Sequence, residues 1–171
     1  MWASKNKHTI TKRNQSGFTI VELLIDIVVI AILAAITIAA YNGIQQRARD
    51  SAAKSDLGQS VRLTEMANTD PNIGSYPKSA SDVQNLKIKL SRPTYQAAIY
   101  CYRSAGDAWA LVVETTDGKA YYVSNSTTTP TPYSGTVGGV SGATICPNVG
   151  VSSPGWQWYL TLGGSWWAGA A

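Results

Sequence analysis

The chain contains few of the residues on which most enzymes depend. Only 14% of its 171 residues are charged, a balance more typical of a surface or extracellular protein than of a cytosolic enzyme. His8 is the single histidine, so the rest of the chain lacks the commonest general base and most histidine-containing nucleophile and metal sites. A glycine-rich, lysine-containing phosphate loop is also missing. We therefore expect no catalytic residue, no metal, no cofactor and no enzymatic activity.

Cysteine is also scarce. Cys101 and Cys146 are the only two, too few for a zinc site built from cysteine alone. If this region leaves the cytosol, a disulfide closing a loop of about 45 residues would add up to about 4 kcal/mol of stability. The alternative is two unrelated buried thiols.

Basic residues are not spread evenly along the chain. The net charge is +4, and the surplus consists of Lys5, Lys7, Lys12 and Arg13. From residue 18 onward basic and acidic side chains are equal in number, so the electrostatic footprint of a DNA-binding domain is missing. The length suits one compact domain with an accessory segment.

A smaller basic group remains as a weaker hypothesis for DNA or another anion. It consists of Lys87, Lys89, Arg92 and Arg103. If the fold gathers these four side chains, they could form a positively charged patch. The favoured interpretation is a solvated charged loop, so DNA is an unlikely partner.

The most informative segment runs from Phe18 to Ala40. Its polar residues are Thr19, Glu22, Asp26 and Thr37. A helix of this length spans about 35 Å, enough to cross a bilayer. Basic residues precede it and none follows until Arg47, which predicts a cytoplasmic amino terminus.

Two ordinary interpretations of this segment leave something unexplained. A secretory signal has a shorter apolar region without acids. A plain membrane anchor fits the length, but an acid near the middle of a bilayer costs about 2.5 to 3.5 kcal/mol. Glu22 and Asp26 would then have no purpose.

The residues Gly17-Phe18-Thr19-Ile20-Val21-Glu22-Leu23-Leu24 resemble the processing motif of type IV prepilins and pseudopilins. The resemblance extends over about residues 12 to 60. It implies an α+β pilin fold, in which a long amino-terminal helix, first transmembrane and then amphipathic, packs on a small antiparallel β-sheet head. It also implies that a membrane prepilin peptidase cleaves between Gly17 and Phe18, that the Phe18 amine is N-methylated, and that Glu22 is the assembly residue.

An amine at Phe18 and a carboxylate at Glu22 would both be stranded in an apolar bundle, where an ion pair with a neighbouring copy relieves most of the penalty. Such a pair fixes the alignment of one helix against its neighbour more than it adds to the stability of the filament. Asp26 lies four residues later on nearly the same helix face. It could share the amine, pair with another copy, or be a protonated acid tolerated near the bundle. Ala39 stands where the family's major pilins often carry proline, and Gly43 could supply flexibility instead.

The pattern divides the chain into a basic leader over residues 1–17, a helix over 18–68 and a β-rich head over 69–171 with a disulfide-bounded carboxy-terminal region. Residues 18–40 are the transmembrane and polymerisation half of the helix. Its later half should bury a stripe composed of Ile44, Ala48, Ala52, Leu57 and Val61. Pro71 and Gly74 should end it.

The head should contain three strands, over Tyr95–Arg103, Trp109–Thr115 and Tyr121–Asn125, joined by two glycine-containing turns. A short helix over 81–86, capped by Ser81, should precede them. Residues 126–155 are rich in Ser, Thr, Pro and Gly and predict a long surface loop. The tail over 156–167 could form a last hairpin whose tryptophans pack in the core or between subunits.

These features favour a structural subunit that passes once through the cytoplasmic membrane and then enters a surface filament, or fimbrium. Its partners would be other copies of itself, the prepilin peptidase, and a pilus assembly platform with its ATPase. Adhesion, twitching motility and DNA uptake are all compatible uses. One alternative is a pseudopilin of a type II secretion or competence machine. Another is a membrane-tethered binding domain whose aromatic tail recognises a ligand.

Overall fold

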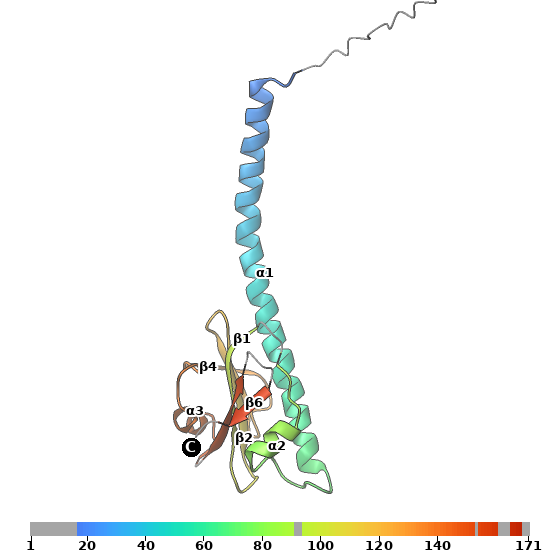
Figure 1. Ribbon diagram of the computed structural model, residues 1–171, viewed down its shortest axis with the longest axis vertical. Coiled ribbons are helices and arrows are strands. Elements are labelled where there is room, and N and C mark those ends of the chain that lie inside the picture. The colour runs from blue at the N-terminus through green and yellow to red at the C-terminus, as the bar shows by residue number, and fades with distance from the viewer. Residues whose placement is uncertain (1–16, 91–93, 153, 161–164, 169–171) are drawn as a thin grey trace, which may run out of the picture. The chain divides into compact units, whose positions relative to one another are not determined.

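The computed structural model describes residues 17–90, 94–152, 154–160 and 165–168 (Figure 1). The backbone forms three helices and six strands in these residues: α1 (Ile20–Thr69), α2 (Ala80–Asn85), β1 (Tyr95–Tyr102), β2 (Trp109–Thr115), β3 (Ala120–Ser124), β4 (Thr131–Tyr133), α3 (Gly142–Asn148), β5 (Gly155–Leu160) and β6 (Ser165–Ala168). The predicted α+β class, with a long first helix and a small antiparallel sheet, is confirmed. The chain divides into two compact units, residues 1–42 and 43–171.

The first unit contains the apolar part of α1. Every described side chain from residue 17 to residue 42 is exposed, and α1 is long and apolar enough to cross a membrane. The helix continues without a break past Ala39 and Gly43, because alanine is a strong helix former and a single glycine lowers helix stability by only about 1 kcal/mol. It ends at Thr69, just before Asp70 and Pro71 form a turn.

The second unit contains the head, in which residues 43–69 of α1 cover one face of the sheet (Figure 1). The predicted apolar stripe is only partly correct, since Ile44 remains 65% exposed whereas Leu57 is fully buried. The buried positions of α1 are Ala53, Asp56, Leu57, Ser60, Thr64 and Ala67.

Half of that buried face is polar, which an apolar pattern could not predict. The Tyr95 hydroxyl donates to Asp56 Oδ2 at 2.9 Å, and the hydroxyls of Thr64 and Tyr100 lie 3.3 Å apart. Burial, together with the Asp56 carboxylate, raises the pKa of Tyr95 far above its usual value, so the phenol keeps its proton. Buried polar groups are tolerated where they are hydrogen-bonded.

The sheet has the strand order β4-β3-β2-β1-β5-β6, and every neighbouring pair is antiparallel. The three predicted strands and the two strands of the tail are present. Residues 126–155 do not form one long loop, because β4 and α3 lie within them. β4 is a three-residue edge strand with Pro132 at its centre. The structure describes no side chains for residues 157–168, so the predicted packing of Trp158, Trp166 and Trp167 lies outside it.

Two hydrophobic clusters occupy the two faces of the sheet. The first lies between the sheet and helices α1 and α2, with Tyr100 and Trp109 stacked at 5.9 Å between ring centroids. The second lies on the opposite face, under α3 and the chain that leads to it. Cys101 of β1 and Cys146 of α3 are joined by the predicted disulfide within this second cluster.

The cap of the short helix α2 lies two residues earlier than the sequence suggested. The cap is Ser79, not Ser81, and it forms a capping box with Asp82. Asp82 Oδ2 accepts hydrogen bonds from the backbone N–H groups of Lys78 and Ser79, both at 3.0 Å. The Ser-x-x-Asp spacing lets each of the two side chains bond to the backbone of the other residue.

A buried carboxylate holds the chain between β4 and α3. Glu114 is only 5% exposed, and its Oε2 accepts hydrogen bonds from the backbone N–H groups of Val137 and Gly138, both at 2.8 Å. Charge-assisted bonds of this kind are stronger than neutral ones. Glu114 therefore anchors a segment that has little regular structure.

We expect Glu114→Ala to lower the free energy of unfolding by about 1 to 3 kcal/mol, because two buried N–H groups lose their acceptor. Chemical denaturation of the full-length chain in detergent micelles measures this change. Asp107→Ala is the matched control: this acid is 55% exposed and pairs only with Arg103, so its loss should change stability by less than about 1 kcal/mol. Equal effects of the two variants would contradict an anchoring role for Glu114.

Candidate functional site at the start of the first helix

The first turn of α1 is closed by a reciprocal capping box between Thr19 and Glu22. The Thr19 backbone N–H and its hydroxyl both donate to Glu22 Oε2, at 2.8 Å and 2.7 Å. The Glu22 N–H in turn points at Thr19 Oγ1, 3.2 Å away. Thr-x-x-Glu before an apolar run is a sequence signature of a helix start, and it explains why α1 begins at Ile20 and not at Phe18.

Sequence reasoning selected Glu22 and missed Thr19. The signal was present, because the Thr-x-x-Glu spacing can be read directly, but Glu22 was interpreted only through its charge. In the structure the carboxylate is held by its own chain at the helix end, where the positive end of the helix dipole also favours an anion. Thr19 thus orients the oxygen atoms of the acid.

The residues before the cap are outside the helix. Gly17 and Phe18 have no regular secondary structure, the Phe18 side chain is 79% exposed, and no atom lies within 4 Å of a Cβ built on Gly17. An exposed peptide bond without backbone ladder bonds can enter the extended site of a peptidase. Breaking the bond after Gly17 would create an α-amine next to Thr19.

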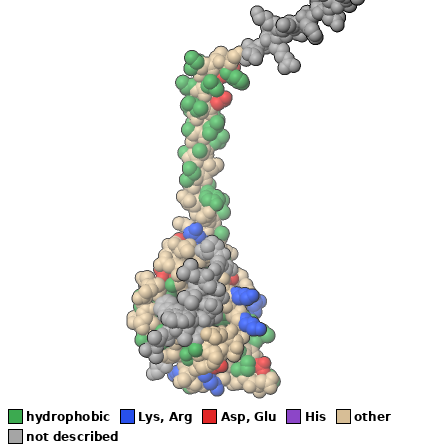
Figure 2. All heavy atoms as spheres, viewed as in Figure 1, with side chains coloured by type: hydrophobic (Ala, Val, Ile, Leu, Met, Phe, Trp, Pro, Cys, Tyr) green, Lys and Arg blue, Asp and Glu red, His purple; other side chains and the backbone are tan. Residues whose placement is uncertain are grey.

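Asp26 is the second acid of the apolar segment and lies one helical turn after Glu22. It is exposed, and no hydrogen bond or ion pair joins it to any residue that the structure describes. Figure 2 shows hydrophobic side chains along the visible face of the first part of α1, with acidic atoms near its amino-terminal end. Neither acid therefore has a cation beside it in the described part of the chain.

The four predicted basic residues do not form one unpaired group. Arg103 makes two hydrogen bonds to Asp107, at 2.6 and 2.7 Å. Lys87 and Lys89 are exposed after α2, and Lys87 has a positive φ of 52°. Arg92 lies outside the described residues. A patch that combines all four stays a prediction.

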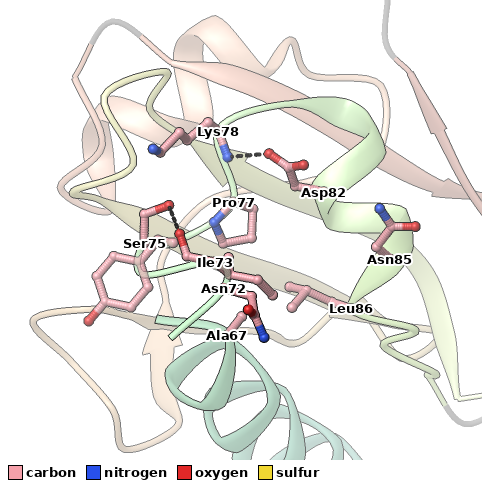
Figure 3. Close-up of a pocket in the computed structure, with 10 residues that line it drawn as sticks. Ala67, Asn72, Ile73, Ser75, Pro77, Lys78, Asp82, Asn85 and Leu86 are labelled. Atoms are coloured by element: carbon pink, nitrogen blue, oxygen red, sulfur yellow. Dashed lines mark hydrogen bonds between the residues drawn. The ribbon is translucent and has the colours of Figure 1, made fainter. Parts of the chain in front are cut away.

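A cavity of about 380 Å³ lies beside the end of α1 (Figure 3). It is lined by residues of α1, the following loop and α2, with Pro77 and Leu86 among the apolar ones and Asn72, Asn85 and Lys78 among the polar ones. The Asp82 carboxylate faces the backbone N–H of Lys78 because it belongs to the capping box. Within the described residues no group of three or more His, Cys, Asp or Glu side chains could hold a metal ion.

Comparison with known proteins supports the importance of the amino-terminal segment. Residues 12–38 match the family described as the prokaryotic N-terminal methylation motif. The chain is 33% identical over 125 residues to the type IV wide pilus major component PilA4 of Thermus thermophilus, an alignment that covers 68% of this chain and 93% of PilA4.

A second relative is the type II secretion system core protein G of Aeromonas hydrophila. It is 32% identical over 95 residues, which cover 56% of this chain and 63% of that protein. No solved structure matches the chain. The relatives are thus a pilus component and a secretion-system component.

Proposed function

Because the chain belongs to the type IV pilin family, we propose that it is the structural subunit of a type IV pilus-like surface filament and not an enzyme. The observation that carries this proposal is the Glu22 carboxylate at the start of an exposed helix of membrane length. A charge in apolar surroundings costs several kcal/mol unless an opposite charge compensates it. Thr19 supplies hydrogen bonds but no charge, and we assign the compensating charge to another copy.

Processing supplies the missing cation. A prepilin peptidase cleaves between Gly17 and Phe18, and N-methylation of the new Phe18 amine leaves it positively charged. The amine of one copy then pairs with Glu22 of its neighbour inside the helix bundle. An incoming helix relieves its charges in only one alignment, so the pair fixes register.

Asp26 extends this site by one helical turn. The distance along α1 between it and Glu22 is about 6 Å, short enough for a single N-methylated ammonium group, which keeps two N–H donors, to interact with both acids. It therefore shares the neighbour's amine or pairs with a further copy. Its exposure in the isolated chain agrees with such a role.

The proposed parts of the chain follow from this route. Residues 1–17 are the basic leader on the cytoplasmic side, residues 18–68 form the helix with 18–40 in the membrane before assembly, and residues 69–171 form the head outside. An assembly platform driven by its ATPase moves subunits from the membrane into the filament. Adhesion, twitching motility or DNA uptake would be the filament's use.

The second candidate is a pseudopilin of a type II secretion or competence machine. It is favoured by the similarity to the type II secretion core protein G of Aeromonas hydrophila. Such a subunit would form a short fibre through the same helix. Imaging cells that lack only this gene separates the two, since loss of long surface fibres supports a pilin and loss of protein export with fibres unchanged supports a pseudopilin.

Mass spectrometry of protein purified from its own membranes tests the processing step. We expect an amino-terminal peptide that begins at Phe18 and carries the extra mass of one methyl group. The apolar segment should remain attached, because the cut lies before it.

Two results would contradict this expectation. An uncut chain that begins at Met1 would remove the amine on which assembly depends. A chain that begins near Tyr41 would have lost the apolar segment, as after ordinary secretion, and could not polymerise through it. A peptide that starts at Phe18 without methylation would retain the charge and so support cleavage while excluding the modification.

A further inference from the structure

A second, smaller cavity of about 290 Å³ lies at the β4 edge of the head, far in sequence from the assembly residues. It is lined by Tyr122, Pro132, Tyr133, Ser134, Gly135 and Asn148. Tyr122 comes from β3, Pro132 and Tyr133 from β4, and Asn148 from the end of α3. Its volume is close to the lower end of the range for small-molecule sites, about 300 to 1,000 Å³.

Two tyrosine rings form the aromatic part of this cavity. Tyr122 and Tyr133 meet edge to face, with ring centroids 6.4 Å apart and an interplanar angle of 78°, and both side chains are half-buried. Gly135 leaves room beside them, since a Cβ at this position would lie 2.7 Å from the Tyr133 ring. The two rings therefore contact each other without any ligand present.

The polar groups of the cavity have no hydrogen-bond partner among the residues that the structure describes. The hydroxyls of Tyr122, Tyr133 and Ser134 and the side-chain amide of Asn148 make no hydrogen bond to any residue that the structure describes. Together they offer both donors and acceptors. The lining contains no charged side chain, so nothing in it compensates an anion or a cation.

We propose that this cavity binds a neutral saccharide. A pyranose ring presents an apolar C–H face, which suits the electron-rich face of an aromatic ring, and an edge of hydroxyl groups, which suits an amide and phenols that can donate and accept. The uncharged lining selects against anionic sugars. The exposed lining is more polar than apolar, which suits a ligand rich in hydroxyl groups better than a hydrophobic one.

The cavity lies on the face of the sheet that α1 does not cover. Tyr122 and Tyr133 pack against the cluster around the disulfide, whereas residues 53 and 57 of α1 pack against the other face. Within one chain, α1 therefore does not cover this side of the head. The site adds a binding activity to the proposed filament, but binding by single chains does not depend on assembly.

The test uses the full-length chain in detergent micelles on an array of neutral and anionic oligosaccharides, followed by titration with the best-retained sugar. We expect retention of neutral sugars, with affinity lowered about tenfold by Tyr133→Ala and by Asn148→Ala, the scale for loss of a ring contact or a hydrogen bond. Tyr133→Phe keeps the ring and should cause a smaller loss. Asn72→Ala, at an exposed asparagine of the other cavity, is the matched control and should bind like the wild type.

Several outcomes overturn the proposal. These are no retained neutral sugar, preferential retention of anionic ones, binding unchanged by Asn148→Ala, and retention of a proline-rich peptide in place of sugar. Thermal unfolding of each variant guards against a general loss of structure, and Asn148 is exposed, so its variant should fold. If the chain in micelles binds sugar but cells form no filaments, the filament proposal is refuted and the saccharide-site proposal stands.

Discussion

Cells that carry Glu22→Ala are expected to cut and insert the subunit normally but to form few or no surface filaments. Without the Glu22 carboxylate, the Phe18 amine of each neighbour would enter an apolar bundle without its principal partner. Breaking a buried ion pair by removing one partner costs about 3 to 5 kcal/mol, and about 3 kcal/mol lowers the equilibrium constant for adding one subunit by about a hundredfold. Counting filaments by electron microscopy against the amount of processed subunit in the membrane measures the loss.

Glu22 also caps its own helix, so the experiment must separate the two roles. Thr19→Val removes the hydroxyl that bonds to Glu22 Oε2 and keeps the negative charge. Loss of a cap costs about 1 kcal/mol, which predicts a mild decrease in filaments. If Thr19→Val and Glu22→Ala were equally severe, capping and not charge pairing would explain the defect. Normal filaments from Glu22→Ala would refute the pairing proposal outright.

Reduction of the Cys101–Cys146 disulfide is expected to lower the free energy of unfolding of the head by about 2 to 4 kcal/mol. The bond closes a sequence separation of 45 residues, and the chain-entropy model assigns about 4 kcal/mol to a loop of that size. The melting temperature should fall by roughly 10 °C. Thermal unfolding of the full-length chain, followed by near-ultraviolet circular dichroism, provides the measurement.

The best control keeps both sulfur atoms. Wild-type protein unfolded in reductant, refolded and compared with oxidised protein differs only in the cross-link, whereas Cys101→Ala with Cys146→Ala also removes side chains that are fully buried. The double variant should therefore be less stable than the reduced wild type. Equal melting temperatures of reduced and oxidised protein would show that the cross-link contributes nothing to stability.

The parts of the fold that could be predicted are those with a strong local signal. The apolar run from Phe18 and the stop at Pro71 predict the first helix, and β-prone runs separated by two glycine-containing turns predict β1 to β3. The two cysteines predict their own pairing because the chain has no others. Local pattern was enough in each case.

The parts that could not be predicted depend on long-range partners. Asp56 and Thr64 can be buried because they form hydrogen bonds with Tyr95 and Tyr100 of the sheet. These partners are distant in sequence, so no local pattern predicts the contacts. β4 forms because it pairs with β3, although its own sequence is rich in turn formers. The cavity beside Tyr133 is lined by residues of β3, β4 and α3, so no single stretch of sequence predicts it.

The proline in the edge strand limits how copies of this chain can associate. Pro132 sits in the middle of β4, at one border of the sheet, and it has no N–H to offer an incoming strand. Sheet-to-sheet growth, the route by which exposed borders lead to amyloid-like stacks, is blocked there. In the membrane-stored state that we propose, copies of the chain are therefore kept from joining through the β4 edge.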